Sequence, residues 1–299
     1  MGLDLHSLHL LRHAERAGAD FSSVLTVGRL GLYLSEADLQ RFSAETHKSW
    51  TPAQLAELRR DGFCEAFLRA AFGAKEVTSL DASAYDGATL VHDLNQPLAP
   101  ERTFTAVLDF GTLEHVFNVP VALASLIGAC RVDGHLLHVL PANNWCGHGF
   151  YQFSPEFFFS LYAEGRGFTG TEVFLVEEHR PRTWYRVRNP AHLGKRVQVV
   201  NRERTLVLVM TRKTSHAVSP MKTAPQQSDY VAQWKEKGSP QEARPQRVRH
   251  PALSAAATAI REPLRALRRY VFGHRQQLSR DRGDVEVLDV GSLYGRGSR

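Results

Sequence analysis

The sequence of 299 residues predicts an α/β fold built on a mostly parallel sheet. Three observations lead to this prediction. Residues 104–141 read as strand, turn, helix, turn and strand, which is the pattern of a βαβ unit. Seven short runs of apolar or β-branched residues alternate with helical or polar stretches. Acids and glycines follow several of these runs, as they do where parallel strands end beside a ligand.

The central βαβ unit is the clearest of these elements. Residues 106–110 form a short apolar run that contains Asp109, and residues 119–130 repeat apolar side chains at helical spacing. The pair 133–134, Asp-Gly, is expected to end this helix, and residues 135–140 are expected to form the next buried strand. Because ligands bind beyond the carboxyl ends of parallel strands, we expect a site in the segments that follow the two strands.

The remaining elements follow from local signals. Ser35, Thr51 and Ser154 are good N-cap residues, and proline follows the last two at the first helical position. Further strands are predicted at 22–28, 76–83, 88–94, 171–177 and 205–211, and helices at 4–17, 35–45, 51–60, 63–72 and 154–164.

The charge divides the chain into three parts. Of the 37 Lys and Arg residues, 15 lie in residues 215–299, against 8 of the 31 Asp and Glu residues. The predicted domain, residues 1–214 with a helical insertion at about 35–72, therefore has no excess of basic residues and no sign of nucleic-acid binding. Residues 215–251 read as a disordered linker, and residues 252–299 as a basic amphipathic helix and tail. Such a helix packs on the domain, on a protein partner or on an anionic membrane surface.

The cysteines and histidines indicate no metal site. The three cysteines form no CxxC pair, which favours a reducing, cytoplasmic location and argues against structural zinc. His6, His9 and His13 lie near one face of the first predicted helix, where exposed histidines are more common than metal ligands. The sequence contains no apolar run long enough to span a membrane.

The strand ends carry a resemblance to a known family. The segments are VLTVG (24–28), VTSLDAS (77–83), VHDLNQPL (91–98), LDFGTLEHVFN (108–118), LHVLPANNW (137–145) and GHGFYQFSPEFF (147–158). In these segments the chain resembles the class I S-adenosylmethionine-dependent methyltransferases, most of all a branch associated with polysaccharide assembly. The resemblance implies a Rossmann-like, seven-stranded sheet with helices on both faces and an antiparallel last strand.

The same resemblance implies a cofactor site for S-adenosyl-L-methionine. Asp81 would bind the ribose hydroxyls, and Asp93 and Leu94 would flank the adenine. The methionine end of the cofactor would lie between two turns, formed by Gly28 with Arg29 and by Phe110 with Gly111.

The first glycine turn departs from the family pattern. It reads Gly28-Arg29-Leu30-Gly31, and Thr26 takes the place of the usual acid. The Arg29 cation would either oppose the positive sulfonium or pair with the carboxylate of the ligand. The turn is compatible with weakened, altered or absent cofactor binding.

Candidates for the chemistry of transfer follow the fourth and fifth predicted strands. His115 and His148 could serve as the general base for an oxygen nucleophile, although each could instead be a structural histidine. Asn144, Tyr151 and Gln152 are the candidates for binding a small or sugar acceptor.

Three functions compete on the basis of these residues. The first is a methyltransferase acting on a small or glycosidic acceptor, a substrate class that rests on the resemblance alone. The second is a non-catalytic binding or scaffold protein of the same fold that has lost the glycine turn. The third, a nicotinamide-dependent oxidoreductase, is disfavoured by the missing G-x-G-x-x-G.

Overall fold

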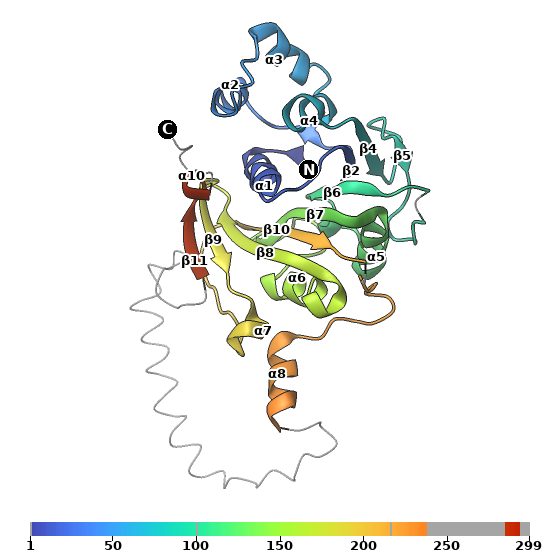
Figure 1. Ribbon diagram of the computed structural model, residues 1–299, viewed down its shortest axis with the longest axis vertical. Helices are drawn as coiled ribbons and strands as arrows, with labels where there is room; N and C mark the ends of the chain where they lie inside the picture. Colours follow the sequence, from blue (N-terminus) through green and yellow to red (C-terminus); the bar gives the residue numbers. More distant parts are fainter. Residues whose placement is uncertain (1, 100, 216, 238–284, 294–299) are drawn as a thin grey trace.

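The computed structural model describes residues 2–99, 101–215, 217–237 and 285–293. The main sheet contains β2 (Ser23–Val27), β4 (Glu76–Asp81), β5 (Leu90–Val91), β6 (Phe104–Phe110), β7 (Cys130–Asn143), β8 (Phe168–Glu177), β9 (Thr183–Val187), β10 (Thr205–Lys213) and β11 (Val285–Asp289). Their order is β11-β9-β8-β10-β7-β6-β2-β4-β5 (Figure 1). A second, two-stranded sheet pairs β1 (Gly2–Leu3) with β3 (Gly31–Leu32). The predicted α/β class is confirmed.

The strand directions also agree with the expectation. The five strands β5, β4, β2, β6 and β7 are paired in parallel. β10 is antiparallel to both of its neighbours, β7 and β8. Side chains along β10 alternate between two cores, with Leu206 and Leu208 in one and Val207 and Val209 in the other. This apolar strand is therefore buried on both of its faces.

Helices cover both faces of the sheet (Figure 1). One face packs against α1 (Leu5–Arg16) and α4 (Glu65–Phe72), and the other packs against α5 (Val119–Ala129) and α6 (Pro155–Leu161). The helices α2 (Glu36–Glu45) and α3 (Pro52–Arg59) lie outside α1 and α4 (Figure 1) and contribute to the same core as they do. The predicted caps are confirmed, because Ser35, Thr51 and Ser154 each accept a backbone hydrogen bond in the first turn. Gly73 ends α4 in the left-handed conformation.

The expected count of seven strands is wrong, because two more strands extend the sheet at one edge. β9 lies in the arginine-rich stretch after β8, where Trp184 and Tyr185 are buried. β11 comes from the predicted tail and pairs antiparallel with β9, with Val285 opposite Val187. The arginines around β9 make the local composition polar, so the sequence did not predict a strand there.

Other boundaries also differ from the expectation. α5 ends at Ala129, and β7 begins at Cys130 instead of after the Asp-Gly pair. Asp133, with φ 65°, lies in a bulge between two stretches of β7 that both pair with β6. The predicted linker contains the helix α8 (Ser228–Lys237), which packs beside α7 (Pro190–Leu193). The expected basic helix at 253–272 lies outside the described residues.

No helix in the described part of the chain is long and apolar enough to cross a membrane.

Candidate functional site

The neighbouring strands β2 and β6 mark the point where the strand order reverses, with β4 on one side and β7 on the other. Val27 pairs with Asp109, so the turns that follow these residues lie side by side. Gly28 and Gly111 have φ values of 81° and 92°, a backbone conformation that favours glycine. The Thr112 hydroxyl donates to the Val27 carbonyl at 2.6 Å and joins the two strand ends. Ligands of open α/β sheets bind at such a reversal.

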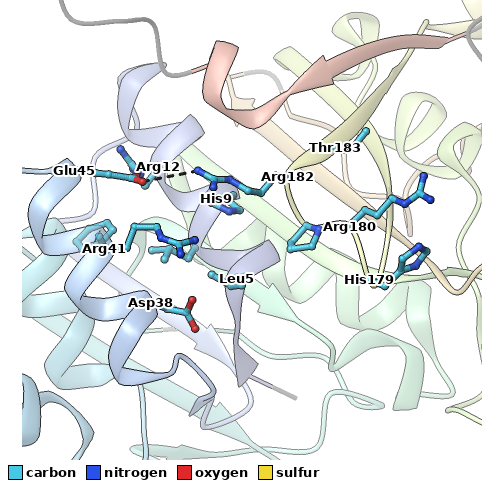
Figure 2. A pocket seen from close by; sticks show the side chains of 13 residues that line it. Leu5, His9, Arg12, Asp38, Arg41, Glu45, His179, Arg180, Arg182 and Thr183 are labelled. Atoms are coloured by element: carbon cyan, nitrogen blue, oxygen red, sulfur yellow. Dashed lines mark hydrogen bonds and ion pairs between the residues drawn. The ribbon is translucent and has the colours of Figure 1, made fainter.

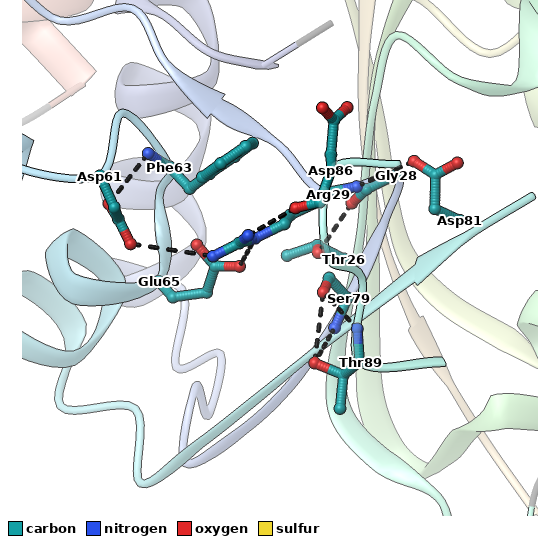
Figure 3. A network of polar contacts seen from close by, with 10 residues as sticks. All are labelled: Thr26, Gly28, Arg29, Asp61, Phe63, Glu65, Ser79, Asp81, Asp86 and Thr89. Atoms are coloured by element: carbon teal, nitrogen blue, oxygen red, sulfur yellow. Dashed lines mark hydrogen bonds and ion pairs between the residues drawn. The ribbon is translucent and has the colours of Figure 1, made fainter. Parts of the chain in front are cut away.

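The side chain of Arg29 extends away from the strand ends (Figure 3). Its Nε donates to Glu65 at 2.9 Å, and its guanidinium lies 3.8 Å from the centre of the Phe63 ring. A second nitrogen donates to the Asp86 carbonyl at 2.5 Å, and Asp61 lies 3.8 Å away. The cation is therefore neutralised by acids of the helical insertion, and its guanidinium does not fill the turn after β2.

The acids predicted at the ends of β4 and β5 have different surroundings. Asp81 is half-buried beside the turn after β2, and its Oδ2 accepts the backbone N–H of Arg29 at 3.3 Å. Asp93 is exposed and accepts hydrogen bonds from Asn95, which hold the pKa of the Asp93 carboxyl below its ordinary value. Leu94 is buried in the core. Asp81 thus lies next to the strand reversal, and Asp93 lies at the surface.

A buried polar chain supports the turn after β6. His138 of β7 is fully buried between Asp109, 2.8 Å from Nδ1, and the Tyr162 hydroxyl, 2.8 Å from Nε2. The other oxygen of Asp109 accepts the backbone N–H groups of Thr112 and Leu113 at 3.1 and 3.3 Å. Asp109 therefore holds the start of the next segment in place from inside the core.

That segment is the 3-10 helix η1 (Leu113–His115), and it meets the loop after β7. The Glu114 Oε1 lies 3.5 Å from Nε2 of His148 and 3.9 Å from Nε2 of His115. The two imidazole rings are 5.1 Å apart, edge to face. The structure thus brings together both predicted histidines and adds a carboxylate between them.

Glu114 is the enclosed member of this cluster. Its side chain is 1% exposed, against 40% for His115 and 45% for His148. Burial, with a smaller contribution from the Asp109 charge, raises the pKa of Glu114 to about 8. Burial and the neighbouring His148 lower the pKa of His115. The carboxyl group is therefore largely protonated near pH 7 in the absence of a bound cation.

The loop reaches Glu114 through a glycine. The backbone N–H of Phe150 donates to the Glu114 carbonyl at 2.6 Å, and Gly149 lies beside that contact with φ 69°. A Cβ at Gly149 would lie 2.7 Å from the Glu114 carbonyl oxygen. Only glycine permits this approach, which also fixes the position of His148.

The three predicted acceptor-binding side chains make hydrogen bonds within the protein. The Asn144 amide donates to the Glu203 carbonyl at 2.8 Å, and the Tyr151 hydroxyl donates to the Phe117 carbonyl at 2.8 Å. The Gln152 side chain accepts the backbone N–H of Trp145 at 2.9 Å. These contacts hold the loop in shape.

A pocket of about 200 Å³ connects the strand ends with the cluster. Its wall includes Phe110, Gly111, Glu114, Trp145 and His148, together with residues at the start of the chain. The pocket therefore has an aromatic side and a titratable side. Residues predicted for the cofactor and residues predicted for the chemistry of transfer share it.

A second pocket, of about 350 Å³, lies between α1, α2 and the segment that precedes β9 (Figure 2). Its lining is rich in basic side chains, namely His9, Arg12, Arg41, His179, Arg180 and Arg182. Arg12 and Arg182 both approach Glu45. Burial, followed by the nearby Arg182 and Arg12 charges, lowers the pKa of His9 to about 4.

Sequence reasoning expected a site in the segment that contains Asp109 and Glu114, but it gave no role to Glu114, to Asp109 as a support or to His138. The available signal for Glu114 was its position between two predicted site features, the glycine after β6 and His115. His138 gave a weaker signal as one of two histidines, with His135, inside a predicted buried strand. Their partners come from distant segments, so the residue pattern alone does not identify the contacts.

No family model matches the chain, and no curated protein matches it. Among solved structures, it is similar to the N-methyltransferase NodS from Bradyrhizobium japonicum WM9, with 13% identity, 70% of this chain and 94% of that chain covered, and a TM-score of 0.39. It is also similar to the 1,6-didemethyltoxoflavin-N1-methyltransferase of Burkholderia thailandensis, with 14% identity, 71% of this chain and 79% of that chain covered, and a TM-score of 0.36. A third similar structure is the [4+2]-cyclase SpnF, with 13% identity, 70% of this chain and 80% of that chain covered, and a TM-score of 0.39. Similarity at this level carries no argument about activity, and the fold assignment rests on the strand order above.

Proposed function

We propose that the chain is an S-adenosyl-L-methionine-dependent methyltransferase that acts on a hydroxyl group of a small or glycosidic acceptor. The observation that carries this proposal is the pair of glycine turns at the strand reversal. Gly28 and Gly111 lie side by side, Asp81 borders the first turn, and the pocket at the second turn extends to Glu114 and His148.

The two ends of this arrangement would have separate tasks. Backbone at the glycine turns would contact the methionine part of the cofactor, and Asp81 would accept hydrogen bonds from its ribose. Methyl transfer depends mainly on aligning the acceptor oxygen, the methyl carbon and the sulfur. We assign the binding and activation of the acceptor hydroxyl to the cluster of Glu114, His115 and His148. The link to surface-polysaccharide assembly rests on the resemblance of residues 147–158.

The position of Arg29 supports cofactor binding at this altered turn. Its guanidinium is held by Glu65 and the Phe63 ring, so its charge lies away from the place expected for the sulfonium. The side chains nearest to a Cβ at Gly28 would be those of Thr112, at 3.0 Å, and of Asp81 and Leu30, each at 3.9 Å.

Calorimetric titration with S-adenosylmethionine and with S-adenosylhomocysteine tests the proposal. We expect Asp81→Ala to weaken binding by roughly 10- to 100-fold, because hydrogen bonds to a charged group contribute about 1.5–3 kcal/mol. The control Asp20→Ala removes an exposed acid that pairs with Arg131 and should bind like the wild type. Arg29→Met should change the affinity by less than about tenfold, a difference of ~1.4 kcal/mol.

Absence of binding by the folded wild type would contradict the proposal. It would favour the second candidate, a non-catalytic binding protein, for which the sequence Gly28-Arg29-Leu30-Gly31 is the supporting observation. Once an acceptor is identified, His148→Ala should lose methyl transfer and keep cofactor affinity. Unchanged turnover would remove His148 from the mechanism.

A further inference from the structure

We propose that Glu114, His115 and His148 form a binding site for one divalent transition-metal cation at the mouth of the strand-end pocket. One ligand atom from each side chain, a carboxylate oxygen and two imidazole nitrogens, lies within 4.8 Å of the other two. The ligands come from η1 and from the loop after β7, two segments that the fold brings together. The proposal concerns cation binding and does not depend on methyl transfer.

The state of Glu114 is the second observation that points to a cation. Its side chain is 1% exposed, and its Oε2 has no hydrogen-bond partner among the described residues. Its Oε1 faces the two imidazoles at 3.5 and 3.9 Å. A buried carboxyl oxygen without a partner is costly, and coordination of a cation would compensate for that cost.

The ligand set selects the class of metal. Two imidazoles and one carboxylate suit Zn²⁺, Co²⁺, Mn²⁺ or Fe²⁺, whereas Ca²⁺ and Mg²⁺ prefer oxygen ligands. With metal–ligand distances of ~2.0–2.2 Å, ligand atoms around one tetrahedral ion lie about 3.3 Å apart. The ligand atoms, now within 4.8 Å of one another, would have to approach by up to about 1.5 Å, which rotation of the half-exposed His115 and His148 rings would supply. Glu114 can remain where the core holds it.

Three protein ligands leave coordination positions open. The pocket lined by Phe110, Gly111 and Trp145 begins at this cluster, so an oxygen of a bound molecule could occupy an open position. A hydroxyl group bound there would lose its proton more readily. Because a metal ligand uses the nitrogen lone pair that a base would need, cation binding and proton abstraction by the same nitrogen of His148 exclude each other.

Titration of the full-length chain with Co²⁺, after removal of metal with a chelator and dialysis, tests this inference. We expect one equivalent to bind, with visible absorption bands of ligated Co²⁺ that disappear when Zn²⁺ is added. Glu114→Gln and His148→Ala should each weaken binding by at least roughly 10- to 100-fold, the loss seen even for residues that only support ligands. Far-ultraviolet circular dichroism and thermal melting check that each variant is folded.

His179→Ala provides a matched control. His179 also lies 3.8 Å from a carboxylate, that of Glu203, but both side chains are half exposed and no third ligand is grouped with them in the described structure. This variant should bind Co²⁺ like the wild type. Failure of the wild type to bind, or binding that survives in both Glu114→Gln and His148→Ala, would overturn the inference. Cation binding without cofactor binding would contradict the proposed function and leave the metal site standing.

Discussion

Two regions of the molecule bury titratable groups in environments of opposite charge: the insertion side, which holds the basic pocket between α1 and α2, and the loop side, which holds η1 and the loop after β7. On the side of the helical insertion, His9 lies near Arg12 and Arg182, and its pKa is lowered to about 4. On the side of the loop after β7, Glu114 lies near Asp109, and its pKa is raised to about 8. Burial is the main cause on both sides, and like charge adds to it. Both side chains are therefore largely neutral near pH 7.

The difference lies in how each side pairs its charges. The arginines of the insertion side have acidic partners, as Arg29 has Glu65 and Arg12 has Glu45. On the loop side, Asp109 is fully paired, whereas Glu114 faces only His115 and His148 and keeps one oxygen without a partner among the described residues. Glu65 also keeps one such oxygen, but its other oxygen is paired with Arg29. Paired charges hold elements together, and an unpaired buried oxygen is available to a ligand. We therefore propose that the first side supports the structure and that the second carries the chemistry.

The largest expected effect comes from breaking the buried support of the loop side. His138→Leu leaves Asp109 buried without one partner, and loss of one member of a buried pair costs about 3–5 kcal/mol. Urea unfolding should show a decrease of this size in the free energy of unfolding. His135→Leu is the matched control, because His135 is also buried on β7, has a lowered pKa and has an Nδ1 without a partner in the described structure.

We expect a much smaller change for His135→Leu, since no buried acid loses a partner there. Equal losses for His135→Leu and His138→Leu would show that burial on β7, and not the pairing of Asp109, sets the effect. The contrast between paired and unpaired charges would then fail on the loop side.

A smaller effect is expected where the loop approaches Glu114. Gly149→Ala and Gly147→Ala both place alanine at a positive φ, 69° and 85°. Only the first also places a Cβ 2.7 Å from the Glu114 carbonyl oxygen, whereas a Cβ at Gly147 meets nothing within 4 Å. Gly149→Ala should therefore destabilise the protein by about 1–3 kcal/mol more than Gly147→Ala.

Thermal melting of the two glycine variants measures that difference. Gly149→Ala should also weaken Co²⁺ binding, because the loop that carries His148 must move away from η1. Equal stability and equal Co²⁺ affinity in the two variants would mean that the loop position does not depend on this close approach.

The framework of the fold could be predicted because its signals are local. Capping at Ser35, Thr51 and Ser154 and the apolar run at 106–110 depend on neighbouring residues alone. The edge strands could not be predicted in the same way. β9 has arginines on both sides, and β11 lies about a hundred residues further along the chain, so only tertiary pairing reveals them.

The candidate site also contains features that local signals predict and features that depend on tertiary contacts. Gly28 and Asp81 lie at or near the carboxyl ends of predicted strands and Gly111 follows one, and parallel pairing places all three at one edge. The surroundings of Glu114 depend on the charge of Asp109 in the core and on the close approach of Gly149, which lies 35 residues further along the chain. The final directions of Asn144, Tyr151 and Gln152 likewise depend on carbonyl and amide groups in other segments. Contacts of this kind have no signature in sequence spacing.

The last expected effect is on the pH dependence of stability, and it has opposite signs on the two sides. The folded pKa of His9, about 4, lies below its unfolded value of 6.5, so its contribution is complete above pH 6.5 and is lost as the pH falls toward 4. The folded pKa of Glu114, about 8, lies above its unfolded value of 4.5, so its contribution is complete below pH 4.5 and is lost as the pH rises toward 8.

Each side chain should therefore contribute a slope of up to about 1.4 kcal/mol per pH unit within its own window. His9→Gln should lose less stability than the wild type between about pH 6.5 and 5.5, and Glu114→Gln should lose less between about pH 6 and 8. Urea unfolding in the presence of a chelator measures both slopes without a bound cation. If His9→Gln keeps the acid slope of the wild type, the arginine-rich side does not hold His9 neutral. If Glu114→Gln keeps the alkaline slope, the acid of the loop side is solvated and the contrast between the two sides disappears.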